Sequence, residues 1–440
     1  MTFIFGNNWY ILHKNSDTIP GEPTVTTNTI RVGIIGTGSR GINCISHQIA
    51  EQAGDLDITI TAFCNRTESR MHIALEDVNR IAAAAGNRTF SPAFYSDPMD
   101  LISDDNVDLI VITTPTAAHR EAAIPALRSG KKVYLDKPIA HTLEDAIAIQ
   151  KEEHNTNNPM IMGFTRRYEQ PWIELYNLLK SGVIGDLKMM LIRAVIPYTH
   201  YFMTWHRTRS LSGGALNDKA SHYTDVFNWF AGGHCLQVNA FGGRNLFEVR
   251  EDAPEFCAVC DDWTCPYRAE LVETGTQDQA RGAIDQTFAH ETDPMRRKDN
   301  CVYKPGADIF DHASIHFQYD NGIVASIFYA IYGPKAEDEE TFELVGTKGR
   351  MILTRLKGEI DLVTDYGERR EEIIQCKAEA FETSHFGADR KLVQEIAQFA
   401  RGGPSPVDGQ YGMEATRMIL SAMQSIDQGG ETVRLANGPI

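Results

Sequence analysis

Three glycines near the start of the chain, Gly36, Gly38 and Gly41, have the spacing G-x-G-x-x-G. The first glycine can turn the chain sharply, the second lets backbone amides approach a pyrophosphate, and the third lets a helix pack closely on a strand. An apolar run at 32–35 precedes them and a predicted helix at 42–52 follows, so a bound phosphate would lie at a helix N-terminus. The pattern predicts a dinucleotide-binding turn in preference to an ordinary strand–turn–helix. Its residues are Gly36, Thr37, Gly38, Ser39, Arg40 and Gly41.

Asp218 and His222 are four residues apart, and on a helix both side chains would project from one face. A carboxylate in that position can orient an imidazole and support its charged form, and histidine titrates close to neutral pH. The two residues are therefore a candidate acid/base pair for proton transfer. An ordinary exposed ion pair has the same spacing, so the pair alone leaves both interpretations open.

Four of the eight cysteines fall in a polar stretch, 245–308, which we expect to be an insert between strands. They are Cys257, Cys260, Cys265 and Cys301. Four thiolates can bind zinc tetrahedrally and fix a loop that is too polar to fold alone. The spacing is irregular for a zinc ribbon, and His290 or His312 could replace a cysteine. A structural zinc site, a disulfide and plain buried thiols therefore all remain open.

A second predicted strand, 58–64, ends at Asn65 and Arg66, where NAD-binding chains carry an acidic residue for the ribose hydroxyls. Asn65 can still bond the ribose, and the guanidinium of Arg66 can pair with the 2′-phosphate of NADP. We therefore expect NADP or NAD as the cofactor and favour NADP. The alternative is that Arg66 is a solvated arginine at the start of a helix.

The elements that must position these residues alternate regularly from 30 to 164. Nearly continuous apolar runs, as buried parallel strands require, are separated by helical patterns. The strands are expected at 58–64, 107–113 and 132–135 and the helices at 42–52, 68–85 and 121–129. Ligands bind beyond the carboxyl ends of such strands, so the ends at Gly36, Thr114 and Asp136 should converge on one crevice. We expect a Rossmann domain over 30–164.

From 165 to 440 the pattern changes to longer strands joined by short turns, of which Asp320-Asn321-Gly322 is the clearest hairpin signal. The strands are expected at 188–196, 236–242, 313–319, 324–332, 340–345, 349–354 and 360–364, and two late helices at 388–401 and 412–427. This predicts an α+β domain with a large, mostly antiparallel open sheet. The fold class is therefore α/β with two domains.

The totals exclude several classes of partner. The 440 residues suggest two domains, and a net charge of −17 argues against nucleic acid and anionic membrane surfaces. No apolar run approaches the roughly 18 residues that cross a bilayer. Residues 1–29 look like an extension without the basic and apolar regions of a secretory signal, so we expect a cytoplasmic protein with reduced thiols.

Taken as an ordered series, these motifs resemble the Gfo/Idh/MocA oxidoreductases, of the glucose–fructose oxidoreductase and inositol dehydrogenase type. The resemblance runs from about residue 31 to the C-terminus. It rests on 36–41, on Thr114-Pro115 with His119, on Asp136-Lys137-Pro138, on 163–168 and on 213–222. The family usually has Glu before the Lys-Pro pair, and this chain has Asp136.

The resemblance implies that Lys137 is the catalytic lysine beside the nicotinamide and that Asp218 and His222 form the acid/base pair. Removing a hydride from a carbinol carbon requires the hydroxyl proton to leave, so His222 is the expected base and Lys137 would bind the developing alkoxide. Lys219 stands where the family often has an apolar residue, and it is either a substrate contact or a solvated lysine.

Further contacts are expected from the motifs and from the loops that could line the substrate side. The other expected cofactor contacts are Thr114, Pro115, His119, Asp136, Lys137 and Arg167. The expected substrate contacts are Lys137, Trp205, Arg207, Asp218, Lys219 and His222. Arginines and an aromatic in the loops around 205–207 suit a polyhydroxylated or anionic substrate, and they suit a solvated surface equally well.

The leading interpretation is an NAD(P)-dependent dehydrogenase acting on a secondary alcohol of a sugar, glycoside or cyclic polyol. One alternative is an NAD-dependent glycoside-cleaving enzyme that works by transient oxidation and elimination. Another is a non-catalytic sugar or nucleotide sensor, which would have no need for a base. Large apolar residues on both faces of the strand at 324–332 predict a homodimer or homotetramer assembled through the sheet.

Overall fold

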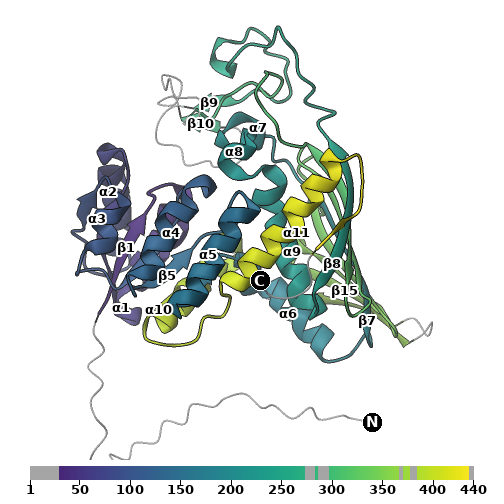
Figure 1. The fold of residues 1–440 in the computed structure, drawn as a ribbon, viewed down its shortest axis with the longest axis horizontal. Coiled ribbons are helices and arrows are strands. Elements are labelled where there is room, and N and C mark those ends of the chain that lie inside the picture. Colours follow the sequence, from purple (N-terminus) through teal and green to yellow (C-terminus); the bar gives the residue numbers. More distant parts are fainter. Residues whose placement is uncertain (1–28, 273–282, 286–296, 366–369, 377–383, 436–440) are drawn as a thin grey trace, which may run out of the picture.

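The structure, a computed structural model, describes residues 29–272, 283–285, 297–365, 370–376 and 384–435. These residues form two sheets with their helices and a projecting insert (Figure 1). The expected N-terminal extension lies outside the described residues except for Thr29. Among the helices that the structure describes, none has the length and apolar character needed to span a bilayer.

The first sheet has six parallel strands in the order β3-β2-β1-β4-β5-β6. Its strands are β1 (Ile30–Ile35), β2 (Ile58–Cys64), β3 (Ala93–Tyr95), β4 (Leu109–Ile112), β5 (Lys132–Leu135) and β6 (Met160–Met162). Strands β2 and β3 lie on one side of β1, and β4, β5 and β6 lie on the other, so the strand order reverses at β1. The loops after β1 and β4 therefore open the crevice in which a Rossmann sheet binds its ligand. The expected fold of this half is confirmed.

Helices cover both faces of the first sheet. They are α1 (His47–Leu56), α2 (Glu68–Ala84), α3 (Pro98–Ser103), α4 (His119–Arg128) and α5 (Leu143–Thr156). A π-helical turn, Arg40–Ser46, precedes α1 where the sequence predicted the α-helix to begin at 42. The Ser46 hydroxyl donates to the Gly41 carbonyl at 2.7 Å, a bond that spans five residues and fits this wider turn.

The second sheet has nine strands in the order β16-β15-β14-β13-β7-β12-β11-β8-β17. They are β7 (Leu187–Val195), β8 (Cys235–Gly243), β11 (His312–Tyr319), β12 (Val324–Ala330), β13 (Glu340–Gly346), β14 (Arg350–Thr354), β15 (Glu359–Thr364), β16 (Arg370–Gln375) and β17 (Val433–Arg434). All neighbours are antiparallel except β7 and β12, which are parallel. The large, mostly antiparallel sheet is therefore confirmed.

One face of this sheet is covered by helices that lie between it and the first sheet (Figure 1). The helices of this half are α6 (Gln170–Lys180), α7 (His200–Met203), α8 (Arg209–Ser212), α9 (Ala215–Ala231), α10 (Ala388–Ala400) and α11 (Gly409–Asp427). Buried residues of α9 and α11 join the sheet in one core. Helix α10 instead packs into the core of the first sheet, so the C-terminal part of the chain returns to the dinucleotide-binding half.

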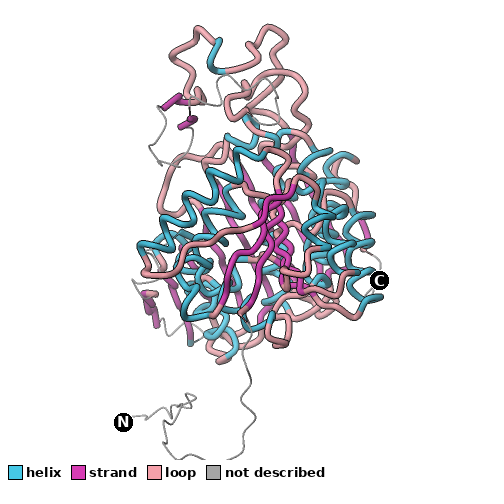
Figure 2. Tube along the Cα trace, turned by 90° about the vertical axis from the view of Figure 1, so that its left-hand side faces the viewer, coloured by secondary structure: helices cyan, strands magenta, loops and turns pink. Residues whose placement is uncertain are grey.

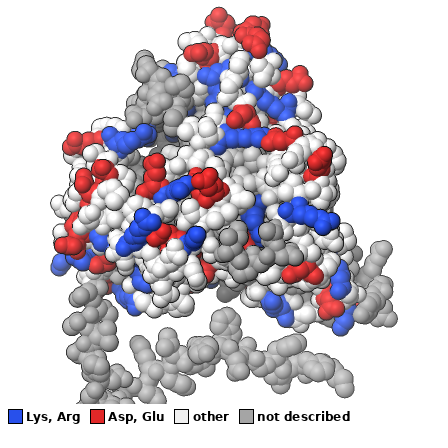
Figure 3. Space-filling model, in the orientation of Figure 1, with Lys and Arg blue, Asp and Glu red and all other residues white. Residues whose placement is uncertain are grey.

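The seven strands predicted beyond residue 165 are all present, with their ends shifted by at most two residues. The elements that were not predicted from the sequence are short or weakly patterned, and they include β3, α3, α5, α7, α8, β16 and β17. The insert projects above α7 and α8 (Figure 1). It is mostly loop, with the short paired strands β9 (Glu270–Val272) and β10 (Ala283–Asp285) (Figure 2). Acidic and basic side chains are interspersed over the face drawn in Figure 3.

Candidate active site

The glycine turn after β1 is built as its sequence predicts. Gly36 has φ +104°, and a Cβ there would lie 2.8 Å from the Thr113 carbonyl. A Cβ on Gly41 would collide with the Gly36 carbonyl oxygen, so both positions need glycine. A Cβ on Gly38 would meet nothing within 4 Å. The space above Gly38 therefore fits a pyrophosphate approaching the backbone amides.

Arg40 follows the glycine turn, and its guanidinium is committed to protein partners. It donates to Asp136 Oδ1 at 3.1 Å, to Asp389 Oδ1 at 2.7 Å and to the Tyr134 hydroxyl at 3.1 Å. Tyr134 in turn donates to Asp136 at 2.9 Å. Arg40 and Asp136, both expected to contact the cofactor, thus tie the glycine turn to the end of β5 and to α10.

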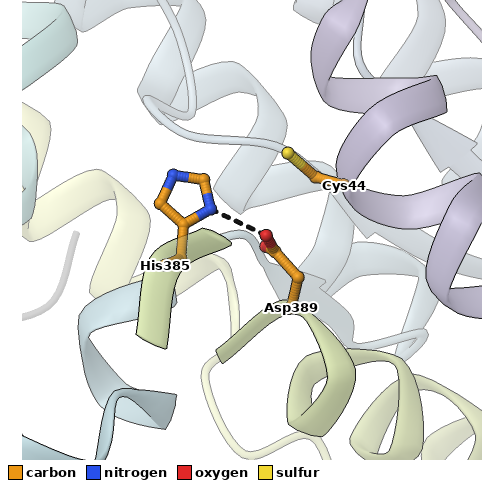
Figure 4. Close-up of side chains that lie close together, drawn as sticks. All are labelled: Cys44, His385 and Asp389. Atoms are coloured by element: carbon orange, nitrogen blue, oxygen red, sulfur yellow. Dashed lines mark hydrogen bonds and ion pairs between the residues drawn. The ribbon is translucent and has the colours of Figure 1, made fainter. Parts of the chain in front are cut away.

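The same carboxylate of Asp389 accepts from His385, and Cys44 lies beside this pair (Figure 4). Burial opposes the charged imidazole, but the hydrogen bond and charge of Asp389 raise the pKa of His385 to about 9. The ligand atoms of Cys44, His385 and Asp389 lie within 4.8 Å of one another. Since two cations, Arg40 and protonated His385, already neutralise Asp389, the group functions as an ion-pair network between the glycine turn and α10.

Asn65 and Arg66, at the end of β2, differ in their side-chain contacts. The Asn65 amide donates to the Thr37 hydroxyl at 2.7 Å and its carbonyl accepts from the Thr67 amide at 2.9 Å. Its side chain therefore shapes the turn in addition to any ribose contact. Arg66 is exposed and makes no ion pair with any residue that the structure describes.

His119 joins the loops that follow β4 and β5. Its Nε2 lies 3.0 Å from the Thr114 carbonyl and its Nδ1 lies 2.9 Å from the Pro138 carbonyl. Burial lowers the pKa of His119. His119 is 1% exposed, and its ring positions Thr114 and the Lys137-Pro138 segment from the buried side of these loops. The Thr114 hydroxyl is buried and has no partner among the described residues, which leaves a donor for a ligand in the crevice.

Lys137 and Asp218 meet between the two halves of the chain. The Lys137 ammonium donates to the Asp218 main-chain oxygen at 2.8 Å and to Oδ1 at 3.1 Å. The Tyr201 hydroxyl donates to the other carboxylate oxygen at 2.6 Å. Burial opposes ionisation, but the Lys137 charge and these bonds hold the pKa of Asp218 well below its usual range.

His222 lies one turn further along α9, and its environment differs from the expected one. We expected the Asp218 carboxylate to orient the imidazole, but both carboxylate oxygens are bonded to Lys137 and Tyr201. The His222 Nδ1 is buried and without a partner among the described residues. Burial and the nearby cations, led by Lys137, lower the pKa of His222 well below its usual value. The ring is therefore neutral at pH 7, the state in which a histidine can accept a proton.

The start of α9 is fixed against the first half. Gly214, with φ +94°, precedes the helix, and the Asn217 amide donates to the Ala140 carbonyl at 3.0 Å in the segment that follows Lys137. Because Asn217 is adjacent to Asp218, this bond sets the depth at which α9 enters the crevice. Asp218 lies in the first turn of α9, where the helix dipole also favours a carboxylate.

Lys219 is neither exposed nor solvated. It is 6% exposed, and its ammonium lies 3.5 Å from Glu340 Oε2 and over the Tyr198 ring. The solvated-lysine interpretation is therefore wrong, because the charge belongs to a buried network. That network consists of Lys219, Glu340, Arg166, Glu169 and Arg355. Burial opposes ionisation of Glu340, but the surrounding cations lower its pKa to about 2.

The other residues expected to contact cofactor or substrate are bonded to, or packed on, other parts of the protein. Arg167 forms a buried ion pair with Asp225 at 2.8 Å, so its guanidinium is held by α9. Arg207 is 6% exposed and donates to the Pro305 carbonyl of the insert at 3.1 Å. Trp205 stacks on His206 with ring centroids 3.9 Å apart. The four insert cysteines line a cavity of their own, separate from Lys137 and His222.

Tyr201 was not singled out from the sequence as a contact, whereas His206 belongs to the loop that was expected on the substrate side. Tyr201 bonds Asp218, and His206 packs on the Tyr201 ring with centroids 4.8 Å apart. Burial lowers the pKa of His206 to about 4. Their signal in the sequence was the aromatic-rich run 198–206, which has no helical or strand period.

Comparison with known proteins places this geometry in a family. The NAD-binding Rossmann model of the oxidoreductase family GFO_IDH_MocA matches residues 30–164, and the model of that family's C-terminal alpha/beta domain matches residues 177–435. The chain belongs to the Gfo/Idh/MocA oxidoreductase family. The family assignment made from the motifs is confirmed.

Individual members are similar at lower identity. Inositol 2-dehydrogenase from Salmonella paratyphi B is 29% identical over 202 residues, which are 46% of this chain and 54% of that protein. Inositol 2-dehydrogenase 1 from Saccharopolyspora erythraea is 30% identical over 219 residues, which are 49% of this chain and 59% of that protein. The chain thus spans little more than half the length of these curated relatives.

Solved structures show the same fold over more of the chain. A levoglucosan dehydrogenase in complex with NADH and levoglucosan has a TM-score of 0.68 at 17% identity, covering 93% of this chain and 100% of that one. The WlbA dehydrogenase from Chromobacterium violaceum, in complex with NADH and UDP-GlcNAcA, has a TM-score of 0.64 at 17% identity and covers 96% and 100%.

Proposed function

We propose that this protein is an NAD(P)-dependent oxidoreductase that transfers a hydride between the nicotinamide and a secondary alcohol of a sugar or cyclic polyol. The observation that carries the proposal is the placement of Lys137, Asp218 and His222 at one point between the two halves. Lys137 reaches there from the carboxyl end of β5, and the other two residues from the first turns of α9. The names of the similar dehydrogenases, which act on inositol and levoglucosan, support the substrate class.

Lys137 and His222 have separate roles, one in stabilising charge and the other in accepting the proton. When bound, the nicotinamide exchanges the hydride with the carbinol carbon. The Lys137 ammonium has three N–H donors, of which two are bonded to Asp218, so the third is available to a substrate oxygen. It stabilises the negative charge that develops on that oxygen. Neutral His222 takes the hydroxyl proton, and its buried Nδ1 has no hydrogen-bond partner among the described residues.

Asp218 serves a positioning role in this scheme. Its carboxylate accepts a hydrogen bond from the Lys137 ammonium and another from the Tyr201 hydroxyl. The acid/base pair inferred from spacing is therefore better described as a lysine–aspartate pair beside an independent histidine base. The catalytic groups would be Lys137 and His222.

For the cofactor we propose NADP in preference to NAD. The support is Arg66, which is exposed at the end of β2 and has no ion-pair partner among the described residues. The proposed holding residues are Gly36 to Gly41, Asn65, Arg66 and Thr114. The hydride-transfer site requires no metal, and a zinc ion in the insert would be structural.

We also propose a homodimer or homotetramer. The uncovered face of the nine-stranded sheet carries large apolar side chains on adjacent strands. They are Met189 (54% exposed), Leu191 (39%), Phe241 (59%), Val324 (38%) and Phe328 (54%). A second copy of the same sheet is the occupant with a matching surface.

A substrate screen tests the proposed function. Cyclic polyols, monosaccharides and disaccharides are offered with NADP and with NAD, and cofactor reduction is followed by absorbance. We expect turnover with a member of this class that is lost in His222→Ala and kept in His72→Ala, a change of an exposed histidine on α2. Release of an aglycone without net reduction would indicate glycoside cleavage instead. Ligand binding without turnover would indicate a sensor.

A further inference from the structure

Four cysteines of the insert surround one small cavity. Cys257, Cys260, Cys265 and Cys301 line a cavity of about 20 Å³, with Tyr267 and Arg268 among the other wall residues. All four thiols are free. A space of this size holds one atom-sized occupant. Because four cysteines line this cavity, its occupant should be one that binds sulfur ligands.

The backbone brings the two most distant of these cysteines side by side. Phe256 and Asn300 form an isolated antiparallel bridge. On one side of it the Cys301 amide donates to the Glu255 carbonyl at 3.0 Å. On the other the Cys257 amide donates to the Asp299 carbonyl at 2.8 Å. Cys257 and Cys301 are therefore fixed as neighbours by main-chain bonds.

The other two cysteines are turned toward the same cavity by local bonds. The Cys260 amide donates to the Cys257 carbonyl at 3.2 Å, which closes the C-x2-C segment into a single turn. Arg268 donates to the Cys260 carbonyl at 2.8 Å and its amide to the Cys265 carbonyl at 3.1 Å. The Ala269 amide lies 3.5 Å from the Cys257 sulfur, and a backbone donor of this kind stabilises a thiolate.

Three cations, Arg207, Arg244 and Lys304, lie near Cys301, and Asp262 is the acidic residue of the cavity wall. Burial and mutual repulsion with Arg244 lower the pKa of Arg207 to about 10. Burial also lowers the pKa of Arg244, and burial with the Arg207 charge lowers that of Lys304. One guanidinium nitrogen of Arg207, Nη1, is buried without a partner among the described residues. The positive charges of Arg207, Arg244 and Lys304 would favour a negatively charged cluster at Cys301.

We propose that these four cysteines form a tetrahedral binding site for one zinc ion, and that this site holds the insert against the wall of the active site. Four thiolates around Zn²⁺ carry a net charge of −2, which matches the surrounding cations. No three of the four sulfurs lie within 4.8 Å of one another in the described chain. Zinc binding therefore draws in the half-buried Cys260 and Cys265 side chains, since Zn–S distances are about 2.3 Å.

The insert needs such a cross-link because it has little structure of its own. Its described secondary structure consists of a single turn and three-residue strands. Of its described apolar side chains, Phe247, Cys257, Ala269 and Val302 are buried in the core, and Tyr267, Tyr303 and Ala307 pack against that core while partly exposed. Loops with so few buried apolar contacts are commonly folded by a metal.

The link to the active site runs through the residue next to Cys301. The Asn300 amide and side chain donate to the Met203 carbonyl at 3.2 and 2.7 Å. Met203 ends α7, which also carries Tyr201, the donor to Asp218. The zinc site thus fixes the helix that positions the Lys137 partner. This second step rests on the proposed function, and the metal site itself does not.

Metal analysis of the purified, reduced protein tests the site. We expect about one equivalent of zinc in the wild-type protein. Cys260→Ser and Cys265→Ser should lose it, whereas Cys376→Ser, a change outside the insert, should keep it. Because a serine variant can fail to fold, the wild-type protein is also reconstituted with Co²⁺, for which we expect sulfur-to-metal charge-transfer and tetrahedral d–d absorption. Protein that binds neither ion, or that keeps its zinc after Cys260→Ser, overturns the proposal.

Chelation of the ion tests the coupling to the active site. We expect metal-free protein to turn over about tenfold more slowly while its affinity for NAD(P) is unchanged, as is usual when support around a site is removed. Full turnover without metal rejects the coupling. Zinc content and cobalt spectra are measured without substrate, so they remain decisive if no dehydrogenase activity is found.

Discussion

The ammonium of Lys137 lies 2.8 Å from the main-chain oxygen of Asp218 and 3.1 Å from its carboxylate. This contact joins the end of β5 to the first turn of α9, so it spans the two halves of the chain. The contact also influences the hydrogen bonding and the protonation of His222. Because both Asp218 carboxylate oxygens are bonded to Lys137 and Tyr201, they do not bond the His222 ring, and burial and the Lys137 charge lower the pKa of His222.

Removing either catalytic group should abolish most of the turnover while leaving the cofactor bound. We expect His222→Ala to reduce kcat by roughly 10²–10⁴-fold, the usual loss for a general base. Lys137→Ala should cost at least as much, because the developing alkoxide loses its charged partner. Steady-state kinetics and cofactor titration by fluorescence measure the two effects. Lys151→Ala, a change of an exposed lysine on α5, is the matched control.

The pH profile should report the depressed pKa of His222. Oxidation requires the neutral ring, and its lowered pKa keeps the ring neutral through the usual histidine range near 6.5. We therefore expect kcat/KM for oxidation to stay level down to about pH 6.5 and to fall only at lower pH. Reduction, which needs the protonated ring, should accelerate as the pH falls. An acid limb near 6.5 that persists in His222→Ala would assign the titration to another group.

Arg66 should discriminate between the two cofactors. If its guanidinium binds the 2′-phosphate, Arg66→Ala should weaken NADP and leave NAD nearly unchanged. A charge-assisted contact of about 1.5–3 kcal/mol corresponds to roughly ten- to a hundredfold in Kd. Calorimetry with both cofactors measures this ratio. Arg88→Ala, an exposed arginine beyond the far end of α2, should change neither Kd. Equal weakening of NAD and NADP by Arg66→Ala would contradict the assignment.

Most of the fold was predictable because its signals are local. The glycine triplet and the apolar runs of β2, β4 and β5 identify a Rossmann sheet without tertiary information. The π-helical turn at Arg40–Ser46 was not predictable, since it differs from an α-helix by one residue per turn. The return of α10 to the first core was missed because an amphipathic pattern shows which face is buried but not against what.

The sequence named residues that the fold brings together at one place, but it did not give their hydrogen-bond partners. The i,i+4 spacing placed Asp218 and His222 on one helix face. The sequence could not show that Asp218 pairs with Lys137, which is distant in the chain, and not with His222. The same limit applies to Lys219: its charge looks solvated in sequence, and only the fold brings Glu340 to it. Tyr201 was missed because a tyrosine in an irregular segment has no distinguishing spacing.

Glu153 should make stability depend on pH. It is 8% exposed and accepts from the Met160 and Gly409 amides at 2.8 and 3.1 Å. Burial raises its pKa from 4.5 to about 7. The folded state therefore holds a proton that the unfolded state releases between these values, so this group lowers stability as pH rises through that window.

Glu153→Gln should remove this dependence. The amide keeps an acceptor oxygen and carries no charge, so the decline in unfolding free energy from about pH 4.5 to about pH 7 should shrink by about 1–3 kcal/mol. Urea unfolding at several pH values measures it. Glu144→Gln, at an exposed position on the same helix, should retain the wild-type slope. An unchanged slope in Glu153→Gln would show that other groups cause the pH dependence.

The uncovered face of the nine-stranded sheet should mediate self-association. Phe328 on β12 is 54% exposed. It pairs with Ser314 on the neighbouring strand β11, and Ser314 pairs in turn with Phe241 on β8. A charge introduced into this row would be buried unpaired in an isologous interface, at a cost of several kcal/mol. We therefore expect the wild-type protein to be a dimer or tetramer at micromolar concentration and Phe328→Glu to be a monomer, as measured by light scattering. Ile73→Glu, at a 67% exposed position on α2, should leave the assembly unchanged. A monomeric wild-type protein would show that this apolar face serves another purpose.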